Sequence, residues 1–239
     1  MPVPHPFPSR LIRGRLIRRY KRFLADVELG DGTVTTAHVA NPGSMLGLTE
    51  PDAEVWLSRS ANPKRKLPLS WELIRVGDGY VGVNTGHPNG LVAGAIAAGA
   101  IEPLRGYETI RREVRYGRNS RIDLLLAGAG RPDCYVEIKS VTLSRPAGIA
   151  EFPDSVTQRG TKHLGELAAM ARAGHRAVMF FLVQREDCAE VRIAADIDPV
   201  YGAAFRAALA AGVEALCFGC RVRPDGISID RRLDMGSKA

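Results

Sequence analysis

Three side chains near the middle of the chain have the types and spacing of a site that binds a divalent metal ion. Asp123 is followed by three leucines, and Glu137 and Lys139 are separated by one residue within the apolar segment 134–141. Side chains alternate between the two faces of a strand, so Glu137 and Lys139 share one face while the apolar residues beside them point the other way. Burying a charge without a partner is costly, and these charges therefore indicate a site.

Two of these groups are carboxylates, which repel each other unless a cation lies between them. A hairpin formed by residues 121–127 and 134–141 would bring Asp123 beside Glu137. A hard divalent cation with oxygen ligands, Mg²⁺ or in its place Mn²⁺, would remove the repulsion. A surface salt bridge between Glu137 and Lys139 is the simpler reading, but their apolar neighbours favour a site.

Cationic side chains gather in three further segments of a chain with a net charge of +7. Arginines with interleaved aromatic rings suit a phosphate backbone whose bases stack on the rings. A charge run is usually a solvated surface, but several runs in a basic protein favour DNA as the partner. The candidate contacts are Arg13, Arg18, Arg19, Tyr20, Lys21 and Arg22, then Lys64, Arg65 and Lys66, and finally Arg159, Lys162 and His163. We favour the interpretation of His163 as an ordinary helix residue over its interpretation as a metal ligand.

The elements that must position these groups change in character along the chain. Short strands separated by Gly-Asp-Gly turns at 30–32 and 77–79 predict a small β-barrel or sandwich within residues 1–84, and an oligonucleotide-binding barrel would suit the basic loops there. Residues 85–239 are predicted to form a second domain. There the expected order is a helix (91–101), strands (109–116, 121–127 and 134–141), a helix (155–173), a strand (177–183), a helix (200–211) and a strand (213–218). This order implies a mixed sheet with helices on both sides.

The four cysteines are scattered through apolar stretches, which fits a reducing, cytoplasmic compartment. Cys217 and Cys220 form a single CxxC, which we interpret as part of a buried strand and not as a metal site. No signal peptide and no apolar run of about 20 residues is found, so no membrane partner is expected. A homodimer is left open.

With these residues in view, residues 16–221 resemble the sugar fermentation stimulation protein family, SfsA. The resemblance rests on the segments Arg19–Asp26, Lys64–Lys66, Trp71–Leu73, Val83–Thr85, Glu113–Gly117, Ser120–Asp123, Cys134–Val141, Phe152–Asp154 and Arg159–Leu164. It implies an N-terminal OB-type domain, a PD-(D/E)xK nuclease-like domain, and a DNA-binding protein linked to sugar metabolism. One departure is Val39-Ala-Asn-Pro-Gly43, where the family typically has Cys-Pro-Asn-Thr-Gly.

The spacing of Asp123, Glu137 and Lys139 is also similar to the motif of the PD-(D/E)xK nucleases, and the resemblance implies roles. Asp123 and Glu137 bind the metal with the backbone carbonyl of Ile138, and Lys139 orients the attacking water. Glu113 is a candidate third carboxylate.

Two functions therefore stand side by side: a metal-dependent deoxyribonuclease, and a DNA-binding regulator that keeps the fold without cleaving. A carbohydrate enzyme is a weaker third. Its acid and base would have to work beside a lysine, and the aromatic content is 6%.

Overall fold

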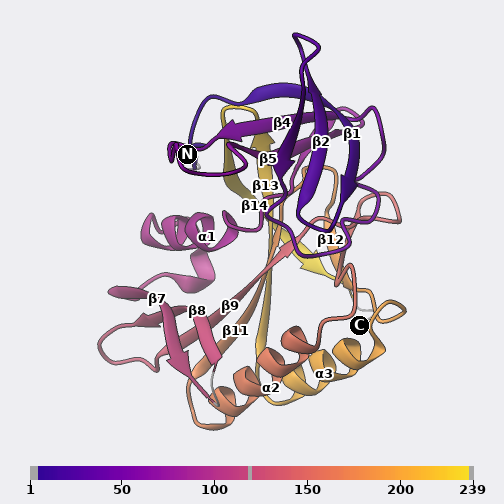
Figure 1. Cartoon of the computed structure of the whole chain (residues 1–239). Coiled ribbons are helices and arrows are strands. Elements are labelled where there is room, and N and C mark those ends of the chain that lie inside the picture. The colour runs from indigo at the N-terminus through magenta and orange to yellow at the C-terminus, as the bar shows by residue number, and fades with distance from the viewer. Residues whose placement is uncertain (1–4, 118–119, 237–239) are drawn as a thin grey trace.

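Two β-sheets organise the computed structural model, which describes residues 5–117 and 120–236 (Figure 1). The first sheet has the strand order β3-β2-β1-β4-β5-β6, and a bridge from His38 to Ser70 closes it into the predicted OB-type barrel. Its strands are β1 (Ile12–Tyr20), β2 (Leu24–Leu29), β3 (Val34–His38), β4 (Glu54–Arg59), β5 (Leu69–Val76) and β6 (Gly79–Gly82). Both Gly-Asp-Gly segments join antiparallel strands, β2 to β3 and β5 to β6, as predicted.

The second sheet is mixed, as predicted, with the strand order β10-β12-β14-β13-β11-β9-β8-β7. Strands β9, β11 and β13 run parallel in its centre, and the hairpin β7–β8 pairs antiparallel with β9. The strands are β7 (Thr109–Tyr116), β8 (Ser120–Ala127), β9 (Cys134–Val141), β10 (Ile149–Phe152), β11 (Arg176–Val183), β12 (Glu190–Ile193), β13 (Glu214–Arg223) and β14 (Gly226–Met235).

Helices cover both faces of this second sheet (Figure 1). Helix α1 (Pro88–Ala97) packs on one face, in a core that also contains Leu73 of the barrel. Helices α2 (Gln158–Arg172) and α3 (Pro199–Ala210) pack on the other face. A short 3₁₀ turn (Glu102–Leu104) follows α1. Within residues 5–117 and 120–236, none of the helices has the length and apolar character needed to cross a bilayer.

Some elements differ from the prediction. Strands β10, β12 and β14 were not predicted, and the basic segment around Arg15 lies in a strand, β1. Helix α2 begins at Gln158, three residues later than predicted, because the Thr157 hydroxyl accepts the Gly160 N–H and caps the helix there. Cys217 and Cys220 lie buried in β13, as interpreted from the sequence.

A buried carboxylate ties the barrel to the start of α1. Glu72 on β5 is 1% exposed, and its oxygens accept hydrogen bonds from the Ser58 hydroxyl (2.5 Å) and the Asn84 amide (2.8 Å) and contact His87 Nε2 (2.7 Å). Burial is the largest influence and acts to raise the pKa of Glu72, but the His87 and Ser58 contacts together hold it below its ordinary value of 4.5. The charged form is therefore the one that the fold stabilises.

Glu72→Ala is expected to lower the free energy of unfolding by about 3–5 kcal/mol, the usual cost of removing one partner from a buried charged network. Because the folded pKa lies below the unfolded one, this stabilisation is complete above pH 4.5 and is lost as the pH falls through the folded value. Urea titrations at several pH values measure both effects. Glu72→Gln should lack the acid-dependent component; a variant as acid-sensitive as the wild type would contradict the assignment.

Candidate active site

The hairpin predicted from the sequence forms, and strands β8 and β9 part where the site begins. Leu124 opposite Val136 is the last pair of the β8–β9 ladder at this end. Beyond it, Asp123 Oδ2 takes the place of a strand partner and accepts the Ile138 N–H at 2.7 Å. The N–H and C=O of one strand residue point to the same edge, so the Ile138 carbonyl faces the side on which Asp123 lies.

Asp123 is held on its other side by the first turn of α1. Asn89 Nδ2 donates to Asp123 Oδ1 at 2.8 Å. Burial, and after it the negative charge of Glu137, raise the pKa of Asp123, against the opposing hydrogen bonds from Ile138 and Asn89. The two carboxylates are therefore close enough to repel, and a cation between them would relieve that repulsion.

Glu137 is buried at the centre of a polar cluster under α2. Its Oε1 lies 2.6 Å from Lys139 Nζ and also contacts His163 Nδ1. Burial acts to raise the pKa of Glu137, but the contacts from His163 and Lys139 outweigh it and lower the pKa. The second oxygen, Oε2, is buried and has no hydrogen-bond partner among the described residues. Such an orphaned carboxylate oxygen calls for a ligand or a water molecule.

His163 is part of this cluster and not of the molecular surface. It is 4% exposed, and its Nε2 accepts from Arg159 Nε at 3.4 Å. An arginine Nε–H can only donate, so Nε2 accepts and the ring proton on Nδ1 faces Glu137. The sequence placed His163 among the DNA contacts and missed this role. A signal was present, because His163 falls on the same helical face as the buried Leu164 and Leu167.

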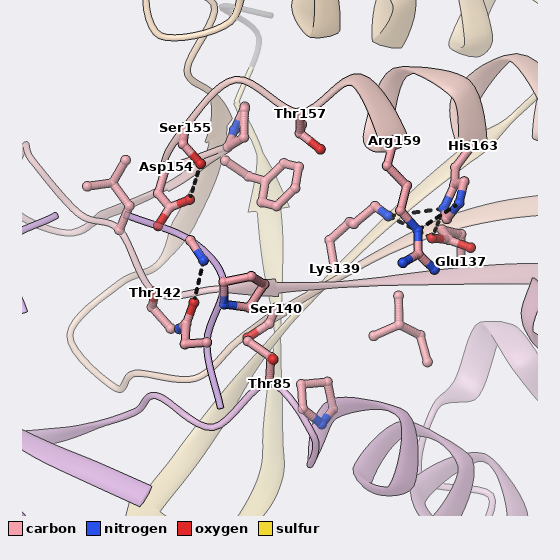
Figure 2. Close-up of a pocket in the computed structure, with 18 of the residues that line it drawn as sticks. Thr85, Glu137, Lys139, Ser140, Thr142, Asp154, Ser155, Thr157, Arg159 and His163 are labelled. Carbon is pink, nitrogen blue, oxygen red and sulfur yellow. Dashed lines mark hydrogen bonds and ion pairs between the residues drawn. The ribbon is translucent and has the colours of Figure 1, made fainter. Parts of the chain in front are cut away.

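These groups line a pocket of about 440 Å³ between the two domains. The barrel contributes the turn 41–43, β9 contributes Glu137 to Ser140, and the segment before α2 contributes residues 153–157. Figure 2 shows one side of the pocket formed by Glu137, Lys139, Arg159 and His163, with Thr85, Ser140 and Thr142 opposite. The N-terminus of α2 borders the pocket, an arrangement that favours anions.

The residues present fit a magnesium ion. Mg²⁺ is usually held by one or two carboxylates together with water and substrate oxygens. Asp123, the orphaned oxygen of Glu137 and the Ile138 carbonyl meet that requirement. Over the described ranges, no group of three or more His, Cys, Asp or Glu side chains converges as a metal cage. Glu113 is exposed and does not line the pocket, but its Oε1 lies 3.5 Å from Asn89 Nδ2, the nitrogen that also donates to Asp123, so Glu113 lies at the edge of the site.

The cations predicted to bind DNA divide into paired and unpaired groups. Arg13 pairs with Glu54 (2.5 Å) and Arg18 with Asp26 (2.9 Å), whose other oxygen accepts from the Tyr20 hydroxyl. Lys162 lies 3.8 Å from Glu166 and outside the pocket, whereas Arg159 lines it. Among the described residues, the predicted cations that form no ion pair and no side-chain hydrogen bond are Lys21, Arg22, Lys64, Arg65 and Lys66, whereas Arg159 has no ion pair but contacts His163.

Arg19, one of the predicted DNA contacts, already has backbone partners in the barrel. Its guanidinium donates to four backbone carbonyls, those of Arg22 (3.1 Å), Asn41 (3.0 Å), Gly43 (2.9 Å) and Ser44 (2.9 Å). Its donors are therefore committed to holding the turn that walls the pocket, and a phosphate would have to displace them.

Comparison with known proteins agrees with the fold and with the resemblance drawn from the sequence. A model described as the SfsA N-terminal OB domain matches residues 17–83, and one described as the sugar fermentation stimulation protein RE domain matches residues 86–226. A sugar fermentation stimulation protein homolog of Rhodospirillum centenum is 62% identical over 97% of this chain and 99% of its own length. A homolog of Paramagnetospirillum magneticum is 60% identical over 96% and 97%. A solved structure, described as Pyrococcus furiosus SfsA in complex with Ca²⁺, superimposes with a TM-score of 0.89 at 24% identity, covering 99% of both chains.

Proposed function

This chain belongs to the sugar fermentation stimulation protein family, and we propose that it is a DNA-binding protein with a Mg²⁺-dependent site for phosphodiester hydrolysis. One observation carries the proposal: Asp123, Glu137 and Lys139 line the same pocket, and a carboxylate oxygen in it lacks a partner. An OB-type barrel forms the opposite wall, and such barrels commonly bind oligonucleotides.

The roles follow from the contacts. Asp123 and Glu137 would hold the ion, fixed in place by Asn89, Ile138 and His163. The ion, when bound, supplies a Lewis acid that stabilises charge on the phosphate and lowers the pKa of a water molecule. Lys139, whose Nζ lies 2.6 Å from Glu137 Oε1, would orient the water and offset the phosphate charge.

The second candidate is a DNA-binding regulator that does not cleave. The observation in its favour is that Lys139 and His163 already satisfy Glu137 Oε1 without any metal. In this case the cluster stabilises the fold, and the pocket serves for recognition only.

Incubation of the whole protein with labelled single-stranded and duplex DNA distinguishes the two. The nuclease proposal predicts cleavage that requires Mg²⁺ or Mn²⁺ and stops on chelation. Binding without cleavage of any DNA form, in the presence of either metal, would instead establish the regulator. A purification control carrying Asp123→Asn excludes a contaminating nuclease.

DNA affinity is expected to fall steeply with salt, because each neutralised phosphate releases counterions. Lys64→Ala/Lys66→Ala should make the slope of log K against log salt shallower by about 2, or about 1 for each lysine. Arg13→Ala should change it less, since Glu54 already pairs with that guanidinium. Fluorescence anisotropy over a salt series measures the slopes, and affinity independent of salt would argue against phosphate contacts.

A further inference from the structure

Large apolar side chains are exposed at the mouth of the pocket, where a purely phosphate-binding surface has no need of them. Phe23 is 43% exposed, Leu46 50% and Val156 70%. They come from three loops that are distant in sequence: the β1–β2 turn, the turn after β3, and the segment before α2. The other large hydrophobic side chains exposed in the described ranges are Val34, Val200 and Leu209.

Two polar contacts hold these three loops together. The Arg19 guanidinium bonds the carbonyl of Arg22, next to Phe23, and that of Ser44, two residues before Leu46. Asp154 joins the third loop to the second. Its Oδ2 accepts the Met45 N–H at 2.9 Å, and its carbonyl accepts the Ser44 hydroxyl at 2.7 Å.

The joint between the second and third loops is tight. A Cβ placed on Gly43 would lie 2.5 Å from Asp154 Oδ2, so these two loops meet without a gap. We call the joined residues 21–23, 43–46 and 154–156 the lip. Gly43, Asp154 and Val156 all line the pocket (Figure 2 labels Asp154), so the lip continues directly into the site.

The lip also carries positive charge. Lys21 and Arg22 are exposed in the turn immediately before Phe23, in backbone conformations with φ of 46° and 63°. Neither forms an ion pair with a described residue. On the pocket side, Arg159 adds a further cation.

Apolar side chains beside unpaired cations fit the chemistry of an unpaired DNA strand. Its bases offer stacking faces, and its phosphates offer charge. A duplex keeps those faces stacked inside and presents only base edges in its grooves. We propose that the lip binds unpaired nucleotides next to the pocket, so that the substrate is DNA with a single-stranded stretch. This rests on the proposed DNA-binding function and specifies its substrate class.

Binding of the whole protein to a labelled single strand and to the blunt duplex of the same sequence, both in EDTA, tests the proposal without requiring cleavage. The single strand is expected to bind more tightly. Phe23→Ala should weaken that binding by about 5- to 150-fold, the range for loss of one stacked base, and leave duplex binding nearly unchanged. Val156→Ala should weaken it less, and 2-aminopurine in the strand should report unstacking on binding.

Val200→Ala is the matched control, since Val200 is 64% exposed on α3, outside the lip. The proposed role of the lip would be wrong, with DNA binding intact, in any of three cases. The lip variants could lose equal affinity for the single strand and the duplex, the Val156 variant could bind like the Val200 variant, or the wild type could prefer the duplex. Binding to neither DNA form would overturn the proposed function together with the lip. Binding of the wild type to anionic vesicles but not to DNA would reassign the lip to a membrane surface.

Discussion

Replacing Lys139 with alanine is expected to slow Mg²⁺-dependent DNA cleavage by about 10²- to 10⁴-fold, the usual contribution of a positioned proton-transfer group. Lys139 Nζ lies 2.6 Å from Glu137, and its side chain is 14% exposed at the pocket wall. The alanine substitution removes the ammonium group, and Glu137 Oε1 keeps its contact with His163 Nδ1. Single-turnover cleavage under saturating protein separates this chemical defect from any loss of affinity.

The pattern across variants is what identifies the role of Lys139. Lys139→Ala should keep the increase in Tm on adding Mg²⁺, because the carboxylates remain, whereas Asp123→Asn should lose both that increase and the cleavage. Lys162→Ala is the matched control, a lysine near the site but outside the pocket. If Lys139→Ala cleaves as fast as Lys162→Ala, Lys139 only neutralises Glu137 and the water is oriented by another group.

Much of the fold follows from local patterns in the sequence. The apolar run in β11 and the helical period of α2 are properties of single segments, and both elements form where they were expected. The carboxylates of the site could be predicted for a related reason. A charge among buried strand residues, as at Glu137, is unusual enough to indicate a site without knowledge of the rest of the fold.

The elements and contacts that were missed depend on pairing between distant segments. Strands β10 and β12 have four residues each and pair with each other across about forty positions. The commitment of Arg19 to the carbonyls of the 41–44 turn has the same origin. In sequence, Arg19 is one more arginine in a basic run, and only the folded barrel brings the turn to it.

The second prediction with a large expected effect on the cleavage rate concerns His163. His163→Ala is expected to slow cleavage by about 10- to 100-fold, the usual cost of removing a group that orients a metal ligand. His163 contacts Glu137 through Nδ1 and Arg159 through Nε2. Substitution by asparagine or by glutamine tests these two contacts one at a time. The amide nitrogen of asparagine falls near the position of Nδ1 and can donate to Glu137, whereas the amide of glutamine reaches the position of Nε2, where its oxygen can accept from Arg159.

If His163 acts by orienting Glu137, His163→Asn should recover most of the lost rate, while His163→Gln should stay close to the alanine variant. The Tm of each variant, measured without metal, tests whether folding alone explains the loss, because a merely structural role would make rate and Tm recover together. Rescue by glutamine and not by asparagine would place the functional contact at Arg159. Recovery by neither, with Tm restored, would mean that a ring is required. An alanine variant as fast as the wild type would show that Asn89, Ile138 and the ion hold the carboxylates in place without help from α2.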